Sequence, residues 1–340
     1  MLTRILISIY NPLRSKAGSF SLQLIVHTSS PQSAGCRQED LNSLKRRDFL
    51  KLGGAAAASG FLPNRLFRSP SPVDHRPPNI LFIIVDDLRP ELGCFGSDFV
   101  KTPHIDRMAE RGLVFNRAYC QQAVCNPSRA SLLTGLRPDT LMIWNNEASF
   151  RKFNPAVKTI PQYFSRSGYK SIKVGKIFHN NRPDPDSWSE PESPIPINQV
   201  YRSKEIRDRQ RYRHAAARRI GRTQKWIEAY IRGPAVECFD ASDHHYWDGA
   251  AADAAIAALW KYRDKGPFFL AVGFMKPHLP YVAPKRYWDL YRREEIPLAS
   301  NPFLPEGAPQ FAMNYLSELA SYENFVQVPN PAEGLSLIHI

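Results

Sequence analysis

The sequence predicts an α/β fold with a mainly parallel central sheet flanked by helices, and two observations support this prediction. First, the segments Asn79–Val85 and Pro267–Phe274 are uninterrupted apolar runs, which are typical of strands buried on both faces. Second, segments with strand character alternate with segments with helical character between them. The 340 residues, 43% hydrophobic and 23% charged, have ordinary globular composition, which excludes disorder, collagen and coiled coil as the main state.

Local signals mark the elements in chain order. After the strand Asn79–Val85, Pro103 near the start and Gly112 at the end bound a predicted helix. Residues 112–116 form a short strand candidate. Further helices are expected at 127–133, 159–166 and 250–260, and a further strand at 169–174. In a parallel sheet of this kind, ligands bind at the carboxyl ends of the strands.

The net charge of +13 is unevenly distributed. Residues 1–78 contribute +7 and residues 202–225 contribute +8, so the rest of the chain is nearly neutral. This distribution argues against a globally basic nucleic-acid binder, and no nucleic-acid partner is expected. The basic segment 202–225 is either a solvated helix face or a surface for a polyanion. The five cysteines are too few and too scattered for a disulfide scaffold or a zinc cluster.

The N-terminal region has the order of a twin-arginine export signal. Arg46 and Arg47 precede a weakly apolar, Ala- and Gly-rich stretch at 52–62, which is too short to span a bilayer. The alternative is an ordinary helix start with a basic flank. We therefore expect an N-terminal extension and signal at 1–62, a Pro-rich linker at 63–78, export by the twin-arginine machinery to the periplasm or cell exterior, and no stable membrane anchor.

The most specific stretch is Cys125–Gly135, which has the pattern C-x-P-S-R-x-x-x-L-T-G. Pro127 favours a helix start, so Cys125 is expected at or just before a helix N-terminus, where free N–H groups and the helix dipole favour an anion. The alternative is an inert buried thiol. Arg129 follows one helical turn later, on the same face, and is expected to hydrogen-bond the modified side chain at position 125.

Three strand ends carry polar residues. Asp86 and Asp87 follow the first buried strand and offer hard oxygen ligands that suit Ca²⁺ or Mg²⁺. The other two ends carry cations and imidazoles that suit anion binding and proton transfer, namely Lys176, His179, Lys276 and His278. Each of these residues alone would more often be a solvated or structural group.

Together these residues resemble the formylglycine-dependent (type I) sulfatase family, which has an alkaline-phosphatase-like fold, and within it the iduronate-2-sulfatases. The resembling stretches are Val85–Pro90, Gln121–Arg129, Arg137–Thr140, Val174–His179 and Phe268–Pro280, within about residues 78 to 334. The resemblance implies metal ligands Asp86, Asp87 and Cys125, catalytic residues Cys125, Arg129, Lys176, His179 and His278, and substrate-binding residues Lys176, Lys276 and His278.

The resemblance also implies the chemistry. Cys125 would be oxidised to formylglycine by a formylglycine-generating enzyme, and the hydrated aldehyde would offer two hydroxyls on one carbon. One hydroxyl would attack sulfur and the other would expel sulfate, whereas a serine would leave a stable ester. The implied cofactors are formylglycine and Ca²⁺, with Mg²⁺ as an alternative. The implied substrate is a 2-O-sulfated uronate in a glycosaminoglycan-like sulfated glycan.

The sequence departs from the family after His278. Relatives have a later strand ending in Ser-Asp-His/Asn-Gly, which supplies two more metal ligands, followed by a lysine. Asp243 and His244 have the right letters but precede Lys276 and follow no apolar strand, so we do not accept them as a substitute. We therefore expect a catalytic domain at 79–334 that is truncated at its C-terminal side, an anomalous tail at 335–340, and a weak or inactive fragment.

Two other functions remain open. One is hydrolysis of phosphate or phosphonate esters on the same fold, although an unmodified Ser or Thr is the usual nucleophile there. The other is non-catalytic binding of a sulfated glycan through the basic segment 202–225.

Overall fold

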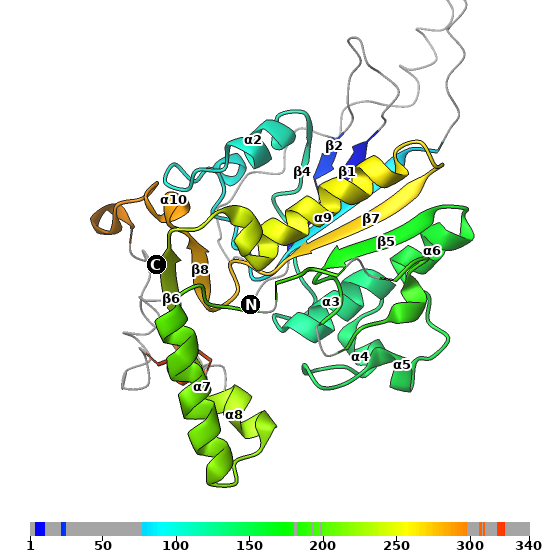
Figure 1. Ribbon diagram of the computed structural model, residues 1–340. Coiled ribbons are helices and arrows are strands. Elements are labelled where there is room, and N and C mark those ends of the chain that lie inside the picture. The colour runs from blue at the N-terminus through cyan, green and yellow to red at the C-terminus, as the bar shows by residue number, and fades with distance from the viewer. Residues whose placement is uncertain are drawn as a thin grey trace, which may run out of the picture. The chain divides into compact units, whose positions relative to one another are not determined.

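The computed structural model describes residues 4–10, 22–24, 77–179, 182–191, 194–197, 199–297, 306–307, 309 and 318–323. The predicted twin-arginine signal, nearly all of the linker at 63–78 and the tail at 335–340 lie outside these residues. The predicted domain boundaries therefore stay predictions. Figure 1 shows the arrangement of the elements.

The central sheet has the strand order β1–β3–β7–β5. Strands β3 (Asn79–Val85), β7 (Phe268–Phe274) and β5 (Lys170–Gly175) are mutually parallel, which confirms the predicted mainly parallel sheet. Strand β1 (Arg4–Tyr10) pairs antiparallel with β3. Sequence analysis assigned these residues to the N-terminal extension and did not predict this strand.

Helices cover both faces of the sheet. On β7, Phe268, Leu270 and Val272 pack against α9 (Trp247–Tyr262), whereas Phe269 and Ala271 point to the opposite face. That opposite face packs against α3 (Cys125–Thr134). Figure 1 shows α9 on one side of the sheet and α3 and α6 on the other. Every residue of β7 up to Gly273 is buried, which explains its unbroken apolar sequence.

The remaining predicted elements lie within a few residues of their expected positions. They are α2 (Pro103–Ala109), β4 (Gly112–Val114), which pairs with β2 (Leu22–Leu24), and α6 (Ile160–Arg166). Helix α6 begins where Thr159 and Gln162 form a reciprocal capping box. Short helices connect these elements, namely α4 (Pro138–Leu141), α5 (Phe150–Phe153) and α10 (Lys285–Trp288).

Two features lie outside the predicted elements. Most of the basic segment forms a helical hairpin of α7 (Lys204–Arg219) and α8 (Gln224–Tyr230). A second small sheet pairs β6 (Val236–Phe239) with β8 (Tyr281–Pro284) in parallel. None of the helices in the described ranges is long and apolar enough to cross a membrane.

Candidate active site

The carboxyl ends of β3, β7 and β5 meet at one edge of the sheet, as the parallel topology requires. Asp86 follows β3 and its N–H donates to the carbonyl of Phe274, 3.1 Å away. Lys176 follows β5 and its N–H donates to the carbonyl of Gly273, also at 3.1 Å. The loop that carries His278 follows β7. The structure thus confirms that the three polar strand ends predicted from sequence converge.

Two glycines let the strand ends approach closely. Gly175 and Gly273 are register partners across β5 and β7. A Cβ on Gly273 would lie 2.0 Å from the carbonyl oxygen of Lys176, and one on Gly175 would lie 2.3 Å from the carbonyl oxygen of Gly273. Gly175 also has φ +78°, which favours glycine. The position of the Lys176 backbone therefore depends on the absence of side chains at both positions.

Asp86 is fully buried between two cations. Its Oδ1 accepts a hydrogen bond from Arg129 Nη2 at 2.6 Å, and its Oδ2 accepts one from the Lys176 ammonium. Burial disfavours the charged carboxylate, but the two cations outweigh this and lower the pKa of Asp86 to about 2. Asp86 is therefore ionised at neutral pH, with both oxygens engaged.

Arg129 ties helix α3 to the end of β5. Its Nη1 donates to the carbonyl oxygens of Lys176 at 2.6 Å and Ile177 at 2.8 Å. Its Nε is buried and has no hydrogen-bond partner among the described residues. Sequence analysis expected Arg129 to face the side chain at position 125. The structure instead directs its Nη atoms to Asp86 and the backbone, which leaves the Nε–H as the donor that a nearby oxygen can use.

Cys125 is the first residue of α3, which confirms its predicted place at a helix N-terminus. Its side chain is 3% exposed, and its Sγ lies 3.9 Å from Oδ1 of Asp87. Burial, together with the charges of Asp86 and Asp87, raises the pKa of the Cys125 thiol to about 12. An unmodified thiol here stays protonated at neutral pH and is a poor nucleophile.

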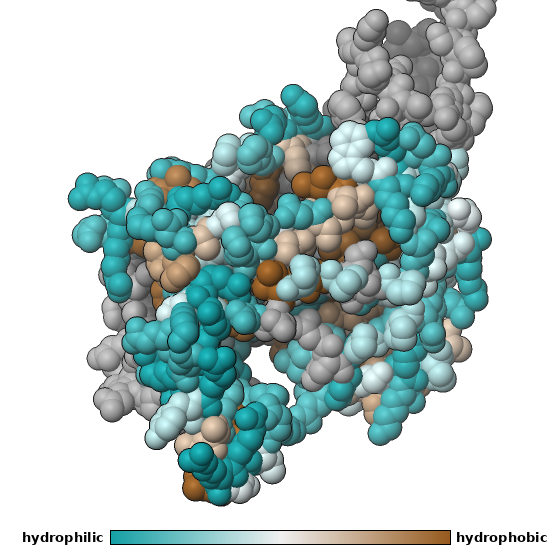
Figure 2. All heavy atoms as spheres, viewed as in Figure 1, coloured by the Kyte–Doolittle hydropathy of each residue, from teal (hydrophilic) through white to brown (hydrophobic). Residues whose placement is uncertain are grey.

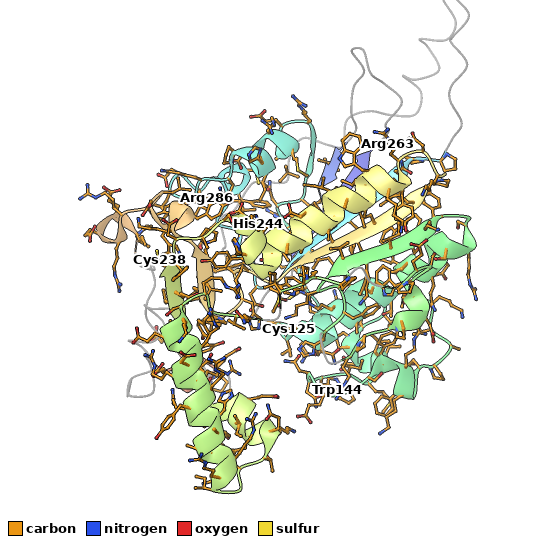
Figure 3. All side chains as sticks on the ribbon, viewed as in Figure 1. Cys125, Trp144, Cys238, His244, Arg263 and Arg286 are labelled. Atoms are coloured by element: carbon orange, nitrogen blue, oxygen red, sulfur yellow. The ribbon has the colours of Figure 1, made fainter. Side chains whose placement is uncertain are left out.

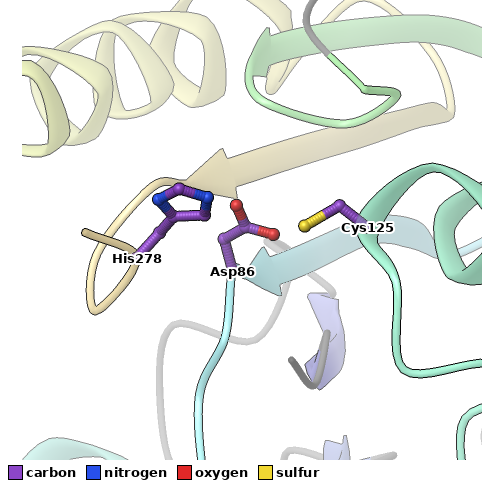
Figure 4. A group of neighbouring side chains, drawn as sticks. All are labelled: Asp86, Cys125 and His278. Carbon is purple, nitrogen blue, oxygen red and sulfur yellow. The ribbon is translucent and has the colours of Figure 1, made fainter. Parts of the chain in front are cut away.

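Figure 4 shows the Asp86 carboxylate between the Cys125 sulfur and the His278 ring. One ligand atom from each of these three residues lies within 4.8 Å of the others. The His278 Nδ1 lies 2.7 Å from the carbonyl oxygen of Leu279, which can only accept, so Nδ1 carries the proton. The Nε2 atom lies 3.9 Å from Oδ2 of Asp87. In the neutral ring this Nε2 is the acceptor that faces the site.

Asp87 adopts φ +57°, which is uncommon for a residue with a side chain. Burial and the neighbouring charge of Asp86 raise the pKa of its carboxyl to about 6. Its two oxygens are those that approach Cys125 and His278. A residue held in this conformation beside the buried Cys125 and the half-buried His278 is typical of a functional site.

Asp248, in the first turn of α9, fixes the loop after β7. Its carboxylate oxygens accept hydrogen bonds from the N–H groups of Met275 and Lys276, both at 2.8 Å. Sequence analysis missed Asp248, because the helix was expected to begin at residue 250. The signal that could have found it is its acidic side chain, because acidic residues are favoured in the first turn of a helix and α9 begins at Trp247.

Lys276 was predicted to bind substrate, but its ammonium faces its own loop. It donates to the carbonyl oxygens of His278 and Pro280, both at 2.7 Å. Burial lowers its pKa to about 8. In this arrangement Lys276 shapes the loop that carries His278.

His179 lies just past β5 and is half-buried, and its carbonyl oxygen accepts from the N–H of Arg182 at 2.8 Å. It is not part of the group of three residues around Asp86. Its role in proton transfer stays a prediction.

The carboxylates of Asp86 and Asp87 are hard oxygen donors and fit a hard divalent cation in kind. They lie side by side at the strand end, next to Cys125. Both oxygens of Asp86 already accept from cationic side chains. Together these two carboxylates offer four oxygens, fewer than the six to eight oxygen ligands typical of Ca²⁺.

The pair Asp243 and His244 was predicted to follow no apolar strand. The strand before it, β6, is short, and the one residue of β6 that is buried is the charged Glu237. Asp243 forms an ion pair with Arg286 and accepts from Tyr287. Figure 3 shows His244, Arg286 and Cys238 separated from Cys125. These residues are not brought to the site around Asp86.

Three comparisons with known proteins complete the description. The family model "Sulfatase" matches residues 78–327. The chain is 38% identical over 253 residues to iduronate 2-sulfatase of Homo sapiens, covering 72% of this chain and 43% of that protein. It is 34% identical over 227 residues to a sulfatase of Formosa agariphila, covering 64% of this chain and 43% of that protein. The chain thus spans less than half the length of these two relatives.

Among solved structures, the crystal structure of a phosphonate monoester hydrolase of Agrobacterium radiobacter matches with 20% identity and a TM-score of 0.42. The match covers 63% of this chain and 44% of that one.

Proposed function

The chain belongs to the sulfatase family, and from that premise we propose that its site hydrolyses sulfate esters with residue 125 as the nucleophile. One observation carries the proposal. The cysteine of the C-x-P-S-R pattern lies at the N-terminus of α3, in one group with the Asp86 carboxylate and the His278 ring. An anionic ester that reaches this helix start meets the positive end of the helix dipole. The next N–H groups are not free as the sequence predicted, because that of Asn126 donates to Asn146, Pro127 has none, and that of Ser128 donates to Val124.

The nucleophile is proposed to be formylglycine, made from Cys125 by a formylglycine-generating enzyme. The raised pKa of the thiol supports a modification, because an unmodified thiol of this pKa is a weak nucleophile. When hydrated, the modified side chain supplies one hydroxyl to attack sulfur and a second to release the sulfate. The orphaned Nε–H of Arg129, one turn along α3, is available to hold one of these oxygens.

The other residues bind the ester and move protons. We propose that Lys176 and His278 hold sulfate oxygens and that His179 accepts the proton when sulfate leaves. To hold a sulfate oxygen, the His278 ring must carry a proton on Nε2 as well as on Nδ1, and this Nε2 faces the site while Nδ1 is fixed on Leu279. Lys276 contributes by shaping this loop instead of contacting substrate.

Asp86 and Asp87 would hold a divalent cation, Ca²⁺ or Mg²⁺. Such an ion would neutralise sulfate oxygens and lower the pKa of the nucleophile. The carboxylates suit this role because both lie at the strand end beside residue 125, with Asp86 fully buried and Asp87 half-buried. Family membership supports a metal of this kind, and the identity of the ion is part of the proposal.

The proposed substrate is a sulfated glycan, with a 2-O-sulfated uronate as the first candidate. This follows from the similarity to iduronate 2-sulfatase of Homo sapiens. The proposed location is the periplasm or the cell exterior, reached by the twin-arginine route that Arg46 and Arg47 indicate.

The test is sulfate release by the chain produced together with a formylglycine-generating enzyme. A 2-O-sulfated uronate disaccharide, an aryl sulfate and an aryl phosphate are compared, and the mass of the peptide that contains Cys125 is measured. We expect slow release from both sulfates, because the described site supplies only two carboxylates for the ion. Equal or faster turnover of the phosphate, or an unmodified Cys125 in active material, would contradict the proposal.

A further inference from the structure

The α7–α8 hairpin carries a cluster of exposed basic side chains at its turn. We call Arg218, Arg219, Arg222 and Lys225 the tip cluster. Figure 2 shows that hydrophilic residues dominate the hairpin. A basic side chain that pairs with a neighbouring acid is less available to a polyanion, so the ion pairs along the hairpin show where a polyanion would bind best.

Acidic partners pair with four of the basic side chains of α7 up to Arg213. Lys204 pairs with Asp208 at 2.7 Å, Arg209 with Glu205 at 3.4 Å, and Arg213 with Glu323 at 3.4 Å. Arg211 also pairs with Asp208.

The three arginines of the tip cluster differ. In the described part of the chain none of them has a carboxylate within 4.0 Å. Arg218 donates to the neutral Gln224 at 2.9 Å, and Arg222 lies 4.6 Å from the ring centroid of Trp226. The three arginines at the turn are therefore not paired with an acid among the described residues.

A series of contacts connects the tip cluster to the start of α3. Lys225 Nζ lies 3.0 Å from Oε1 of Glu147. Glu147 belongs to a loop that holds Asn126, whose side-chain amide donates to the carbonyls of Asn145 at 2.9 Å and Ala148 at 2.8 Å. Asn126 directly follows Cys125. The hairpin turn is thus anchored to the loop that borders the proposed nucleophile.

We propose that the tip cluster binds a sulfated polysaccharide chain and holds it beside the site at residue 125. Guanidinium groups form paired hydrogen bonds with oxyanions, and the groups at the turn have no internal acid to compete. The cluster would contact sulfate groups on sugar units other than the one being hydrolysed. This inference rests on the proposed function for the choice of ligand, because the neighbouring site is proposed to act on sulfate esters.

The experiment measures binding of a heparin octasaccharide to the full chain carrying Cys125→Ala, by calorimetry at about 50 mM and about 150 mM salt. The triple variant Arg218→Gln, Arg219→Gln, Arg222→Gln is expected to bind about tenfold more weakly at the lower salt, with a shallower salt dependence. The matched control is Lys204→Gln, Arg209→Gln, Arg211→Gln, which changes the net charge equally on the same hairpin. This control is expected to lose much less affinity.

Binding of a sulfated disaccharide should not respond to the triple tip variant, since a short ligand cannot reach both places. Equal losses of octasaccharide affinity in the tip variant and in the control would overturn the proposal, because net charge alone would then explain binding. Equally tight binding of a single-stranded oligonucleotide at about 150 mM salt would overturn the choice of ligand. Since no turnover is needed, failure here leaves the proposed function to be judged by sulfate release alone.

Discussion

Arg129 and Asp86 form an ion pair in which both side chains are fully buried, with Nη2 of Arg129 2.6 Å from Oδ1 of Asp86. Nη1 of Arg129 donates to the backbone carbonyls of Lys176 and Ile177, which follow β5, while Nη2 bonds Asp86, which follows β3. The same guanidinium therefore orders the ends of both strands. A buried charge that loses its partner is costly, because water cannot replace the lost interaction. The pair therefore matters for folding as well as for the site.

Replacement of Arg129 tests this. Arg129→Met is expected to lower the free energy of unfolding by about 3–5 kcal/mol, because Asp86 and two carbonyl groups lose their donor. The measurement is equilibrium denaturation in guanidinium chloride. Lys204→Met serves as the control, since the Lys204–Asp208 pair is largely exposed and its loss should cost under about 1 kcal/mol. A change below about 1 kcal/mol for Arg129→Met would contradict the assignment.

A second prediction concerns the glycine pair at the strand ends. Gly273→Ala is expected to cost about 3 kcal/mol of stability, near the upper end for overpacking, because its Cβ would meet the backbone of Lys176 at 2.0 Å. Sulfate release should fall as well, since Lys176 must shift. Gly266→Ala is the matched control, with φ +91° and open space around its Cβ, and should cost only about 1 kcal/mol. The stability of both variants is measured by thermal denaturation. Equal losses of stability in the two variants would argue against a close approach at Gly273.

Sequence could predict which strand ends and which helix start form the site. Parallel strands bring their carboxyl ends to one edge, so Asp86, Lys176 and His278 had to meet once the apolar runs were recognised as neighbouring parallel strands. A helix that starts near Pro127 places Cys125 at its first turn. These conclusions depend on topology and local signals, which a single sequence contains.

Side-chain partners could not be predicted in the same way. Whether the Lys276 ammonium points to substrate or to its own loop depends on the path of a few backbone carbonyls. The role of Asp248 depends on where α9 begins relative to β7. The short strands of the β6–β8 sheet were missed because tertiary pairing, more than intrinsic propensity, decides such segments.

The export signal leads to a third prediction. Replacement of both Arg46 and Arg47 by Lys should keep the protein in the cytoplasm of a bacterial host with a twin-arginine pathway. Cell fractionation and immunoblotting measure this. Arg65→Lys, in the predicted linker, is the matched control and should leave export unchanged. Normal export of the double variant would refute the assignment of the signal.

A fourth prediction isolates the second hydroxyl of the proposed nucleophile. Cys125→Ser can be sulfated once but cannot release the sulfate, so we expect at most a single turnover. Intact mass should rise by one SO₃ group, while steady-state release from an aryl sulfate is lost. Cys238→Ser, at an exposed cysteine away from the site, is the control and should keep turnover. Repeated turnover by the serine variant at the original rate would rule out the formylglycine mechanism.

The proposed cation gives the last prediction. Dialysis against a chelator should abolish sulfate release, and Ca²⁺ or Mg²⁺ should restore it, because the ion neutralises charge that builds up on the ester. Asp87→Asn removes one negative charge beside residue 125 and should raise the cation concentration needed for half-maximal activity by at least about tenfold. Asp98→Asn removes the same charge at an exposed position and should leave that concentration unchanged. If both variants need the same cation concentration as the parent protein, Asp87 does not hold the ion. In a site with few carboxylates, each carboxylate ligand contributes a large share of the affinity for the cation, so its loss would be measurable.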